Sequence, residues 1–104
     1  MKLVFDPVAL DGLRYWVQTD RKTALRILKL IDEIQKDPFK GTGKPEPLKF
    51  NLTGCWSRRI DQTHRLVYKV EEDTVIVLAC RYHYLYEKPR SKLSVVFFWV
   101  MASV

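Results

Sequence analysis

HRLVYKVEEDTVIVLACRYHY, residues 64–84, is the stretch that determines our interpretation of the fold. Two runs of aliphatic, β-branched and aromatic residues, HRLVYKV and TVIVLACRYHY, meet at the turn residues EEDT. Such runs predict two strands, and their short connection favours antiparallel pairing. The second run is apolar on both faces in its first half, which is typical of a central strand that helices cover. It then ends in a cation, two phenols and an imidazole, which a buried strand does not require.

The rest of the sheet is predicted from segments on either side of this hairpin. CWSRRID, residues 55–61, is joined to it by the turn signal DQTH and completes an antiparallel three-stranded meander. MKLVF, residues 1–5, has alternating apolar character and indicates an N-terminal strand. PFKGTGKPEPLK, residues 38–49, contains three prolines and two glycines, so we expect an irregular loop there.

Two helices are predicted between the first strand and this loop. Asp6-Pro7 and Thr19-Asp20 are helix-start signals, and Asp37-Pro38 ends the second helix. The expected apolar stripes are Leu10, Leu13 and Val17, with Trp16 beside them, and Ala24, Ile27, Leu28, Ile31 and Ile34. The fold class is therefore α+β: an N-terminal strand, a two-helix hairpin and the meander, with the helices on one sheet face and the other face open.

Composition indicates one domain with an anionic partner. A chain of 104 residues, 47% hydrophobic, is long enough for a core of its own. Its net charge of +6 points to nucleic acid, the ribosome, an acidic protein or a membrane surface. Cys55 and Cys80 form no zinc-type cluster with His64 and His83, so we expect buried thiols in a reduced, cytoplasmic protein without a metal. The chain start lacks the apolar segment of a signal peptide.

Strand alternation places several cations on the open face of the sheet. Arg65 shares its face with Val67 and Lys69. Hairpin pairing predicts that Arg65 lies opposite Ala79. Either Arg58 or Arg59 must join this face, because adjacent residues of a strand point to opposite sides. The third strand is expected to contribute Val75, Val77, Ala79, Arg81 and His83 to the same face.

These groups suit RNA strand scission without a metal, in which a 2′-hydroxyl attacks the adjacent phosphorus. Glu46 or His83 could supply the acid–base steps, each worth roughly 10²–10⁴-fold. Arg65, with help from Arg59 or Arg81, could bind the phosphoryl oxygens. Tyr82 and Tyr84 could stack on a splayed base. The sequence has no carboxylate cluster, which argues against a divalent-metal nuclease.

Each of these residues also has a purely structural interpretation. Glu46 could be a solvated turn residue, and His83 a half-buried strand end. Arg58 and Arg59 could serve only to block edge pairing, and His64 lies at a turn. On the residues alone, a basic module that binds RNA or protein competes evenly with a ribonuclease.

Four motifs carry a resemblance to a known family. GKPEPL, LTGCWSRRI, HRLVY and RYHY resemble the YoeB/Txe branch of the RelE/ParE toxin superfamily, and the resemblance covers residues 1 to about 84. It implies a RelE-like microbial RNase fold and a bacterial type II toxin, an mRNA interferase that cuts translated mRNA in the ribosomal A site. It also implies a cognate antitoxin of the YefM/Axe type, ribosome and mRNA as partners, and a possible homodimer.

The resemblance also assigns residue roles. Glu46 resembles the general base of the family, Arg65 its phosphate stabiliser, His83 its general acid and Tyr84 its terminal active-site tyrosine. Lys49 and Arg59 match basic positions that bind phosphate or orient the catalytic groups. The remaining candidates for RNA or phosphate binding are Lys44, Arg58 and Arg81. No metal or other cofactor is implied.

The chain departs from the family pattern after RYHY. We expect a toxin domain over residues 1–86 and an atypical apolar extension over residues 87–104. Its end, SVVFFWVMASV, has 11 residues, too few to cross a bilayer of about 30 Å as a helix. It could pack on the domain, act as a sticky β-rich tail, or be lost-stop sequence, and we favour the last two together. The alternative function is a ParE-like or other non-nucleolytic module that acts on a protein such as gyrase.

Overall fold

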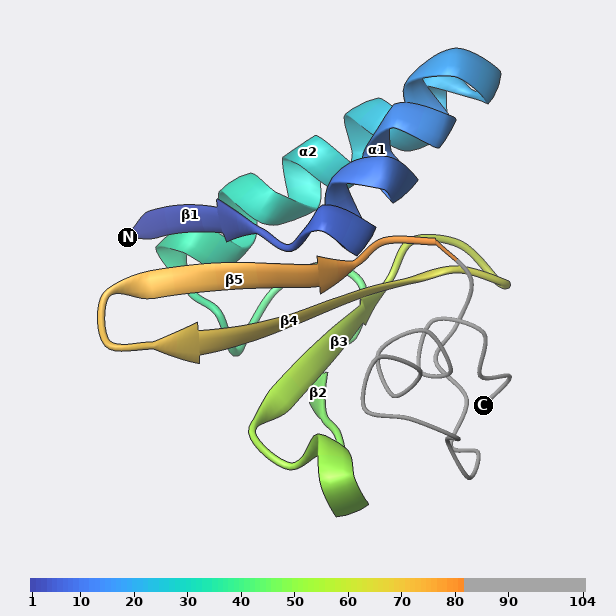
Figure 1. The fold of residues 1–104 in the computed structure, drawn as a ribbon. Coiled ribbons are helices and arrows are strands. Elements are labelled where there is room, and N and C mark those ends of the chain that lie inside the picture. Colours follow the sequence, from blue (N-terminus) through green and yellow to red (C-terminus); the bar gives the residue numbers. More distant parts are fainter. Residues whose placement is uncertain (82–104) are drawn as a thin grey trace.

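The computed structural model describes residues 1–81, which form a five-stranded sheet with two helices on one face (Figure 1). The strand order is β1-β5-β4-β3-β2. In chain order the elements are β1 (Lys2–Phe5), α1 (Pro7–Thr19), α2 (Arg21–Lys36), β2 (Glu46–Pro47), the 3₁₀ turn η1 (Phe50–Leu52), β3 (Cys55–Arg59), β4 (Arg65–Glu71) and β5 (Thr74–Ala79). The predicted α+β class, the helical hairpin and the β3–β4–β5 meander are confirmed.

Two strands extend the predicted meander into a mixed sheet. β1 pairs in parallel with β5, and the chain between these two strands contains both helices and strands β2, β3 and β4. β2 pairs with β3 on the other edge, where Glu46 lies opposite Ser57 and Pro47 opposite Trp56. The expectation that all of residues 38–49 are irregular is therefore wrong. An edge strand tolerates Pro47, because only one side of such a strand needs backbone donors.

The helices begin and end where their capping residues predict. Asp6 precedes Pro7, the first helical residue, and its carboxylate accepts a hydrogen bond from the backbone N–H of Val8 at 2.9 Å. Asp20 accepts one from the backbone N–H of Thr23 at 3.3 Å. Each cap satisfies a backbone donor that has no partner within its helix. Neither helix in residues 1–81 has the length and apolar character of a membrane span.

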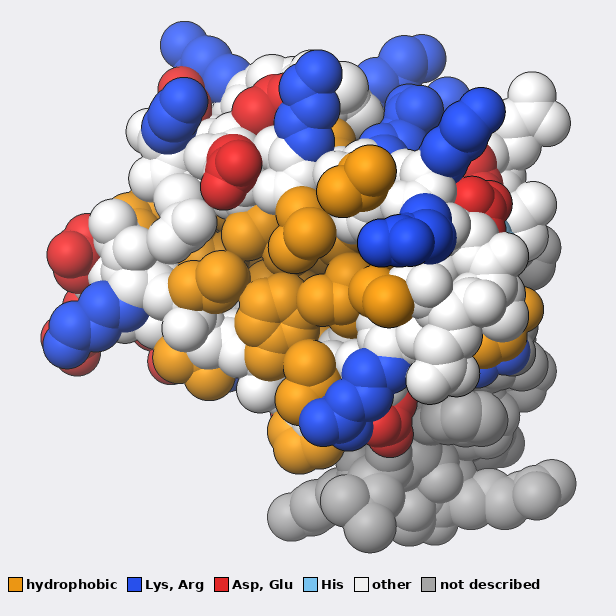
Figure 2. Space-filling view, turned by 90° about the horizontal axis from the view of Figure 1, so that it is seen from above, with side chains coloured by type: hydrophobic (Ala, Val, Ile, Leu, Met, Phe, Trp, Pro, Cys, Tyr) orange, Lys and Arg blue, Asp and Glu red, His pale blue; other side chains and the backbone are white. Residues whose placement is uncertain are grey.

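The main core lies between the helices and the sheet, but α1 turns a different stripe toward it than the sequence predicts. Ala9, Gly12 and Trp16 are buried, whereas Leu10 is 37% and Val17 50% exposed. A side chain at Gly12 would lie 3.0 Å from the Cys80 sulfur, so small residues allow α1 to approach β5 closely. In α2, Leu30 is buried and Leu28 is 43% exposed, the reverse of the expected arrangement. Figure 2 shows the hydrophobic side chains that this arrangement leaves on the helical face.

A β-bulge changes which side chains reach the open face of the sheet. Val67 pairs with Ala79, but Tyr68 pairs with Val77, so Leu78 is an extra residue in β5. Val75 and Val77 consequently face the helices, while Leu78 and Ala79 join a second, smaller core on the open face. The expectation that Val75, Val77 and Ala79 share a face is wrong for this reason. Arg65 does not lie opposite Ala79 either, because Ala79 pairs with Val67. The members of the second core are Leu48, Leu52, Cys55, Val67, Leu78 and Ala79.

Candidate active site

Glu46, Ser57 and Arg65 form a polar cluster on the open face of the sheet. One guanidinium nitrogen of Arg65, Nη1, donates to Glu46 Oε1 at 2.9 Å and to Ser57 Oγ at 3.1 Å. The Arg65 side chain is only 12% exposed, whereas the Glu46 side chain is 51% exposed. The cluster therefore combines a fixed, largely covered cation with a carboxylate that a substrate in solvent can reach.

Sheet register brings these three residues together from separate strands. Glu46 on β2 lies opposite Ser57 on β3, and Arg59, two residues further along β3, lies opposite Arg65 on β4. Since alternate residues share a face, Ser57 and Arg59 both belong to the open side. Arg59 is exposed and forms no ion pair within residues 1–81. Like charges directly opposite one another repel, so the Arg59–Arg65 pair favours an anion nearby.

Arg58 lies on the other side of β3 and has a structural role. Its side chain is fully buried. It donates to the Tyr68 hydroxyl, and Glu33 Oε1 lies 3.5 Å from its Nη1. Three further bonds reach the backbone carbonyl oxygens of Asp37, Lys40 and Thr42. The expectation that Arg58 binds phosphate is therefore wrong for this conformation, because no part of its guanidinium reaches the surface.

The bonds of Arg58 hold in place the loop that leads to Glu46. Tyr68 adds to them, since its hydroxyl donates to the backbone oxygen of Pro38 at 2.6 Å. Burial raises the pKa of Tyr68, which keeps this hydroxyl protonated as a donor. Nearer to Glu46, the Arg59 N–H donates to the Gly43 oxygen at 2.7 Å. The helix-covered side of β3 and β4 thus fixes a loop whose end presents a carboxylate on the open side.

The other predicted phosphate-binding residues are arranged around this cluster in different ways. Lys44 and Lys49 are exposed on either side of Glu46 in the chain. Arg81 follows β5, and its guanidinium carbon lies 3.6 Å from the centre of the Tyr15 ring on α1. It is therefore directed toward α1. His83 and Tyr84 lie outside the described residues, as does Tyr82. β5 ends beside Val67, two residues from Arg65, so the chain leaves the sheet at the Arg65 end.

Sequence reasoning missed Ser57 and Tyr68 as contributors. Ser57 has no exposed surface, and its alternation with Arg59 was the signal that it shares the open face. Tyr68 alternates with Arg65, Val67 and Lys69 and so lies on the helix side, but only the structure identifies Arg58 and Pro38 as the partners of its hydroxyl. In the part of the chain that the structure describes, no His, Cys, Asp and Glu side chains gather in a set suited to a metal ion.

Comparisons with known proteins agree with this fold over most of the chain. A family model described as the YoeB-like toxin of bacterial type II toxin–antitoxin systems matches residues 5–84. "Toxin RelK" of Mycobacterium tuberculosis is 59% identical over 80 residues, which cover 77% of this chain and 94% of that protein. "Toxin YoeB" of Escherichia coli K12 is 50% identical over 84 residues, 81% of this chain and 100% of that protein.

Solved structures extend the similarity to three dimensions. A YoeB/ParE toxin from Agrobacterium tumefaciens superposes with a TM-score of 0.79 at 43% identity, covering 81% of this chain and 100% of that one. A YoeB dimer from Staphylococcus aureus gives 0.75 at 41% identity, with 81% and 98% covered. The fold and these relatives define a toxin of a bacterial type II toxin–antitoxin system, with the fold of the RelE superfamily. Within that class, the chain belongs to the YoeB-like toxin family.

Proposed function

We propose that this toxin is a metal-independent endoribonuclease that cuts mRNA in the ribosomal A site and thereby inhibits translation. The observation that carries the proposal is the Arg65–Glu46 pair, held at 2.9 Å on an open sheet face. Membership of the YoeB-like family supports it, as does the net charge of +6. Because ribosomes translate in the cytoplasm, the protein acts there.

In this mechanism Glu46 takes the proton of the attacking 2′-hydroxyl. Its side chain is half exposed, so substrate can reach it without rearrangement of the sheet. Arg65 binds the phosphoryl oxygens as charge builds up in the transition state, and its low exposure strengthens that interaction. Ser57 keeps the guanidinium aimed at the open face while the phosphate displaces part of its contact with Glu46. His83 protonates the leaving 5′-oxygen, and Tyr84 contacts the base or phosphate.

The same proposal includes a cognate antitoxin that neutralises the toxin. A relative from Staphylococcus aureus, 40% identical to this chain with a TM-score of 0.74, has been solved as a YoeB–YefM complex. We extend that partner class, and the dimer seen for another relative, to this protein. The antitoxin partner would block access of RNA to Glu46 and Arg65.

The proposal is tested by adding the toxin to an mRNA that purified ribosomes are translating and mapping the cuts by primer extension. Arg65→Ala and Glu46→Gln should each lower the cleavage rate by about 100-fold or more, because each removes a group that acts in the transition state. Arg21→Ala, an exposed substitution at the start of α2, should change little. Equal cleavage by all three variants, or inhibition of DNA gyrase without cleavage, would overturn the proposal in favour of a toxin that acts on a protein.

A further inference from the structure

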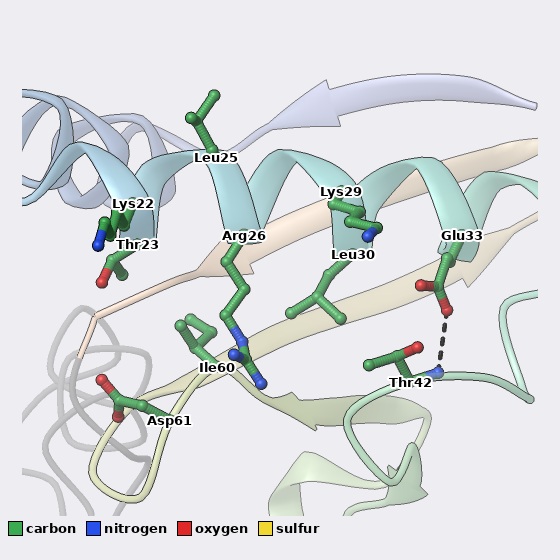
Figure 3. A pocket seen from close by; sticks show the side chains of 10 residues that line it. All are labelled: Lys22, Thr23, Leu25, Arg26, Lys29, Leu30, Glu33, Thr42, Ile60 and Asp61. Atoms are coloured by element: carbon green, nitrogen blue, oxygen red, sulfur yellow. Dashed lines mark hydrogen bonds between the residues drawn. The ribbon is translucent and has the colours of Figure 1, made fainter.

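A groove lies between α2 and the loops that follow β3 and precede β2, on the helix side of the sheet. It encloses about 510 Å³. Lys22, Arg26 and Lys29 line it from α2, and Thr42 and Asp61 line it from the loops. Figure 3 shows the Arg26 side chain extending from the helix toward Ile60, between the helix and the β3–β4 connection. The Glu46–Arg65 cluster lies on the opposite, open face, so the groove is a separate feature.

The carboxylates that line the groove are already occupied by hydrogen bonds. Glu33 Oε1 accepts from the backbone N–H of Thr42 at 2.9 Å, and this bond holds the pKa of Glu33 below its ordinary value. Asp61 Oδ1 accepts from the backbone N–H groups of Thr63 and His64 at 2.8 and 2.6 Å. Neither acid forms an ion pair with the lysines or the arginine on the α2 wall.

Within residues 1–81 none of the three cations forms an ion pair, although, after hydrogen bonds from threonine residues, Lys22 also lowers the pKa of nearby Asp20 and Lys29 also lowers that of Glu33. Lys22 and Arg26 are four residues apart, and Arg26 and Lys29 three, so they are neighbours on one helix surface. Like charges at these spacings destabilise a helix by a few tenths of a kcal/mol per pair. Asp20 and Glu33 offset part of that cost for Lys22 and Lys29, but Arg26, between them, forms no ion pair with another described residue. An arrangement of this kind is expected where an external anion supplies the missing charge.

The spacing of the cations favours a regular polyanion. Lys22 and Lys29 are seven residues apart, which corresponds to about 10 Å along the helix axis. Each strand of a double helix advances about 3.4 Å along the axis per nucleotide, so the row of three cations matches about three nucleotides of a helical strand.

We propose that this groove, walled by Lys22, Arg26 and Lys29, binds the phosphodiester backbone of RNA away from the bond being cut. Ile60 and Asp61 of the groove directly follow Arg59, which lies opposite Arg65 in the sheet. The groove and the catalytic cluster therefore lie on opposite sides of the sheet, next to the same end of β3. The inference goes beyond the proposed function, because it requires a polyanion but no cleavage.

The test compares two triple variants of the full chain with the same change in net charge. Lys22→Ala/Arg26→Ala/Lys29→Ala removes the groove cations. Lys2→Ala/Arg21→Ala/Lys36→Ala removes three exposed cations that do not line the groove. Affinity is measured by fluorescence anisotropy for a short labelled 2′-O-methyl RNA, which cannot be cut, and by co-sedimentation for purified ribosomes, over about 50–200 mM salt. Thermal melts monitored by circular dichroism confirm that both variants are folded.

The groove variant should bind at least about tenfold more weakly than the control variant. The slope of log K plotted against log salt concentration should also be shallower by about 2, because each lost phosphate contact removes about 0.7. Weaker binding of both probes identifies a backbone contact available to any RNA strand, including the substrate. Weaker binding of ribosomes alone identifies ribosomal RNA as the source of the phosphates. Equal affinities of the two variants for both probes would overturn the proposal, as would a loss confined to a poly-L-glutamate probe, which would indicate an acidic protein segment. The binding assays do not depend on cleavage, so the two proposals can fail separately. A protein that binds these probes but cuts no mRNA would refute the proposed function and not the groove proposal.

Discussion

Arg58 and Arg59 are adjacent residues of β3, and their environments are opposite because a strand presents successive side chains to different faces. Arg58 has no exposed surface and forms hydrogen bonds with Tyr68 and three backbone carbonyl groups. Arg59 is exposed beside Arg65. One guanidinium therefore contributes to the stability of the loop, and the other contributes positive charge to the site.

Arg58→Met should lower the free energy of unfolding by about 3 kcal/mol or more. The substitution leaves the carbonyl oxygens of Asp37, Lys40 and Thr42 without their donor, and loss of one member of a buried charged network typically costs this much. Arg59→Met, the matched change one residue along the strand, should alter stability by less than about 1 kcal/mol. Urea denaturation followed by circular dichroism measures both. Similar losses in the two variants would refute the structural role of Arg58.

Ser57→Ala should lower cleavage by about tenfold and the free energy of unfolding by about 1.5–3 kcal/mol at most, so that the protein stays folded. The Ser57 hydroxyl accepts a hydrogen bond from Arg65 at 3.1 Å, and bonds to charged groups are worth about 1.5–3 kcal/mol. Without it, Arg65 retains its pair with Glu46 but is less firmly aimed at the open face. Ribosome-dependent cleavage and urea denaturation are compared with those of Thr63→Ala, which removes an exposed hydroxyl from the β3–β4 connection. Unchanged cleavage by Ser57→Ala would exclude a positioning role.

The Cys80 thiol should make the protein less stable at alkaline pH. Burial raises the pKa of Cys80 from 9.0 to about 12. Between these values the unfolded chain loses the thiol proton and the folded protein keeps it, so the stabilisation is complete below about pH 9 and is lost as pH rises toward 12. Cys80→Ala should therefore lose less unfolding free energy than the wild type between about pH 8 and pH 10.5. Burial also raises the pKa values of Tyr68 and Cys55, so these groups should cause part of the loss that the variant still shows. Identical pH profiles in urea denaturation would contradict this prediction.

At the scale of elements, the sequence predicts those whose signals are local. Asp6-Pro7 and Asp20 cap the helices as expected, and the β4–β5 hairpin forms at its predicted turn. The β-bulge at Leu78 was not predictable, because it depends on how β4 and β5 pair. The stripe of α1 was misassigned for a similar reason. Periodicity shows that a helix has an apolar side, but close approach to β5 selects the small residues Ala9 and Gly12 for the contact.

Gly43→Ala should be more destabilising than Gly54→Ala, although both glycines have positive φ, +89° and +98°. A Cβ at Gly43 would lie 2.9 Å from the backbone oxygen of Arg59 and 3.1 Å from the Arg58 Cβ, whereas a Cβ at Gly54 would meet nothing within 4 Å. Both variants bear the backbone strain, of order 1 kcal/mol, and only Gly43→Ala adds a clash. That clash lies in the loop held by Arg58, so cleavage should fall as well. Equal losses of unfolding free energy in urea would show that the loop adjusts freely.

At the scale of the whole molecule, the candidate site draws on segments far apart in the chain. Glu46 and Arg65 are 19 positions apart. Alternation predicts that Arg65 lies on the open face, but Glu46 lies in a segment that was expected to be irregular, so its face was not predicted. Their contact at 2.9 Å depended on β2, which local signals did not predict because two prolines flank Glu46. The hydrogen bonds of Arg58 were not predictable either, because the sequence of a strand does not show which of its faces a distant loop will cover. Site geometry therefore required the tertiary structure, even where site composition did not.

Deletion of residues 87–104 should leave the domain folded and its cleavage equal or higher. The members of both cores named above lie within residues 1–81, the part that the structure describes, and the family match ends at residue 84. The deleted segment includes SVVFFWV, an uncharged, β-rich run of the kind that promotes aggregation. Soluble yield and light scattering should therefore improve, while the free energy of unfolding in urea changes by less than about 1 kcal/mol.

A full-length variant provides the matched control for this deletion. Phe97→Lys/Val100→Lys interrupts the apolar run but keeps every residue, so it should reproduce the gain in solubility if aggregation is the effect of the segment. If the deletion unfolds the protein, the extension is part of the core, and the lysine variant should then be destabilised as well. If both variants are folded but only the deletion raises cleavage, the extension limits access of RNA to the site by its bulk rather than by its apolar character. Circular dichroism, light scattering and primer extension on the three proteins distinguish these results.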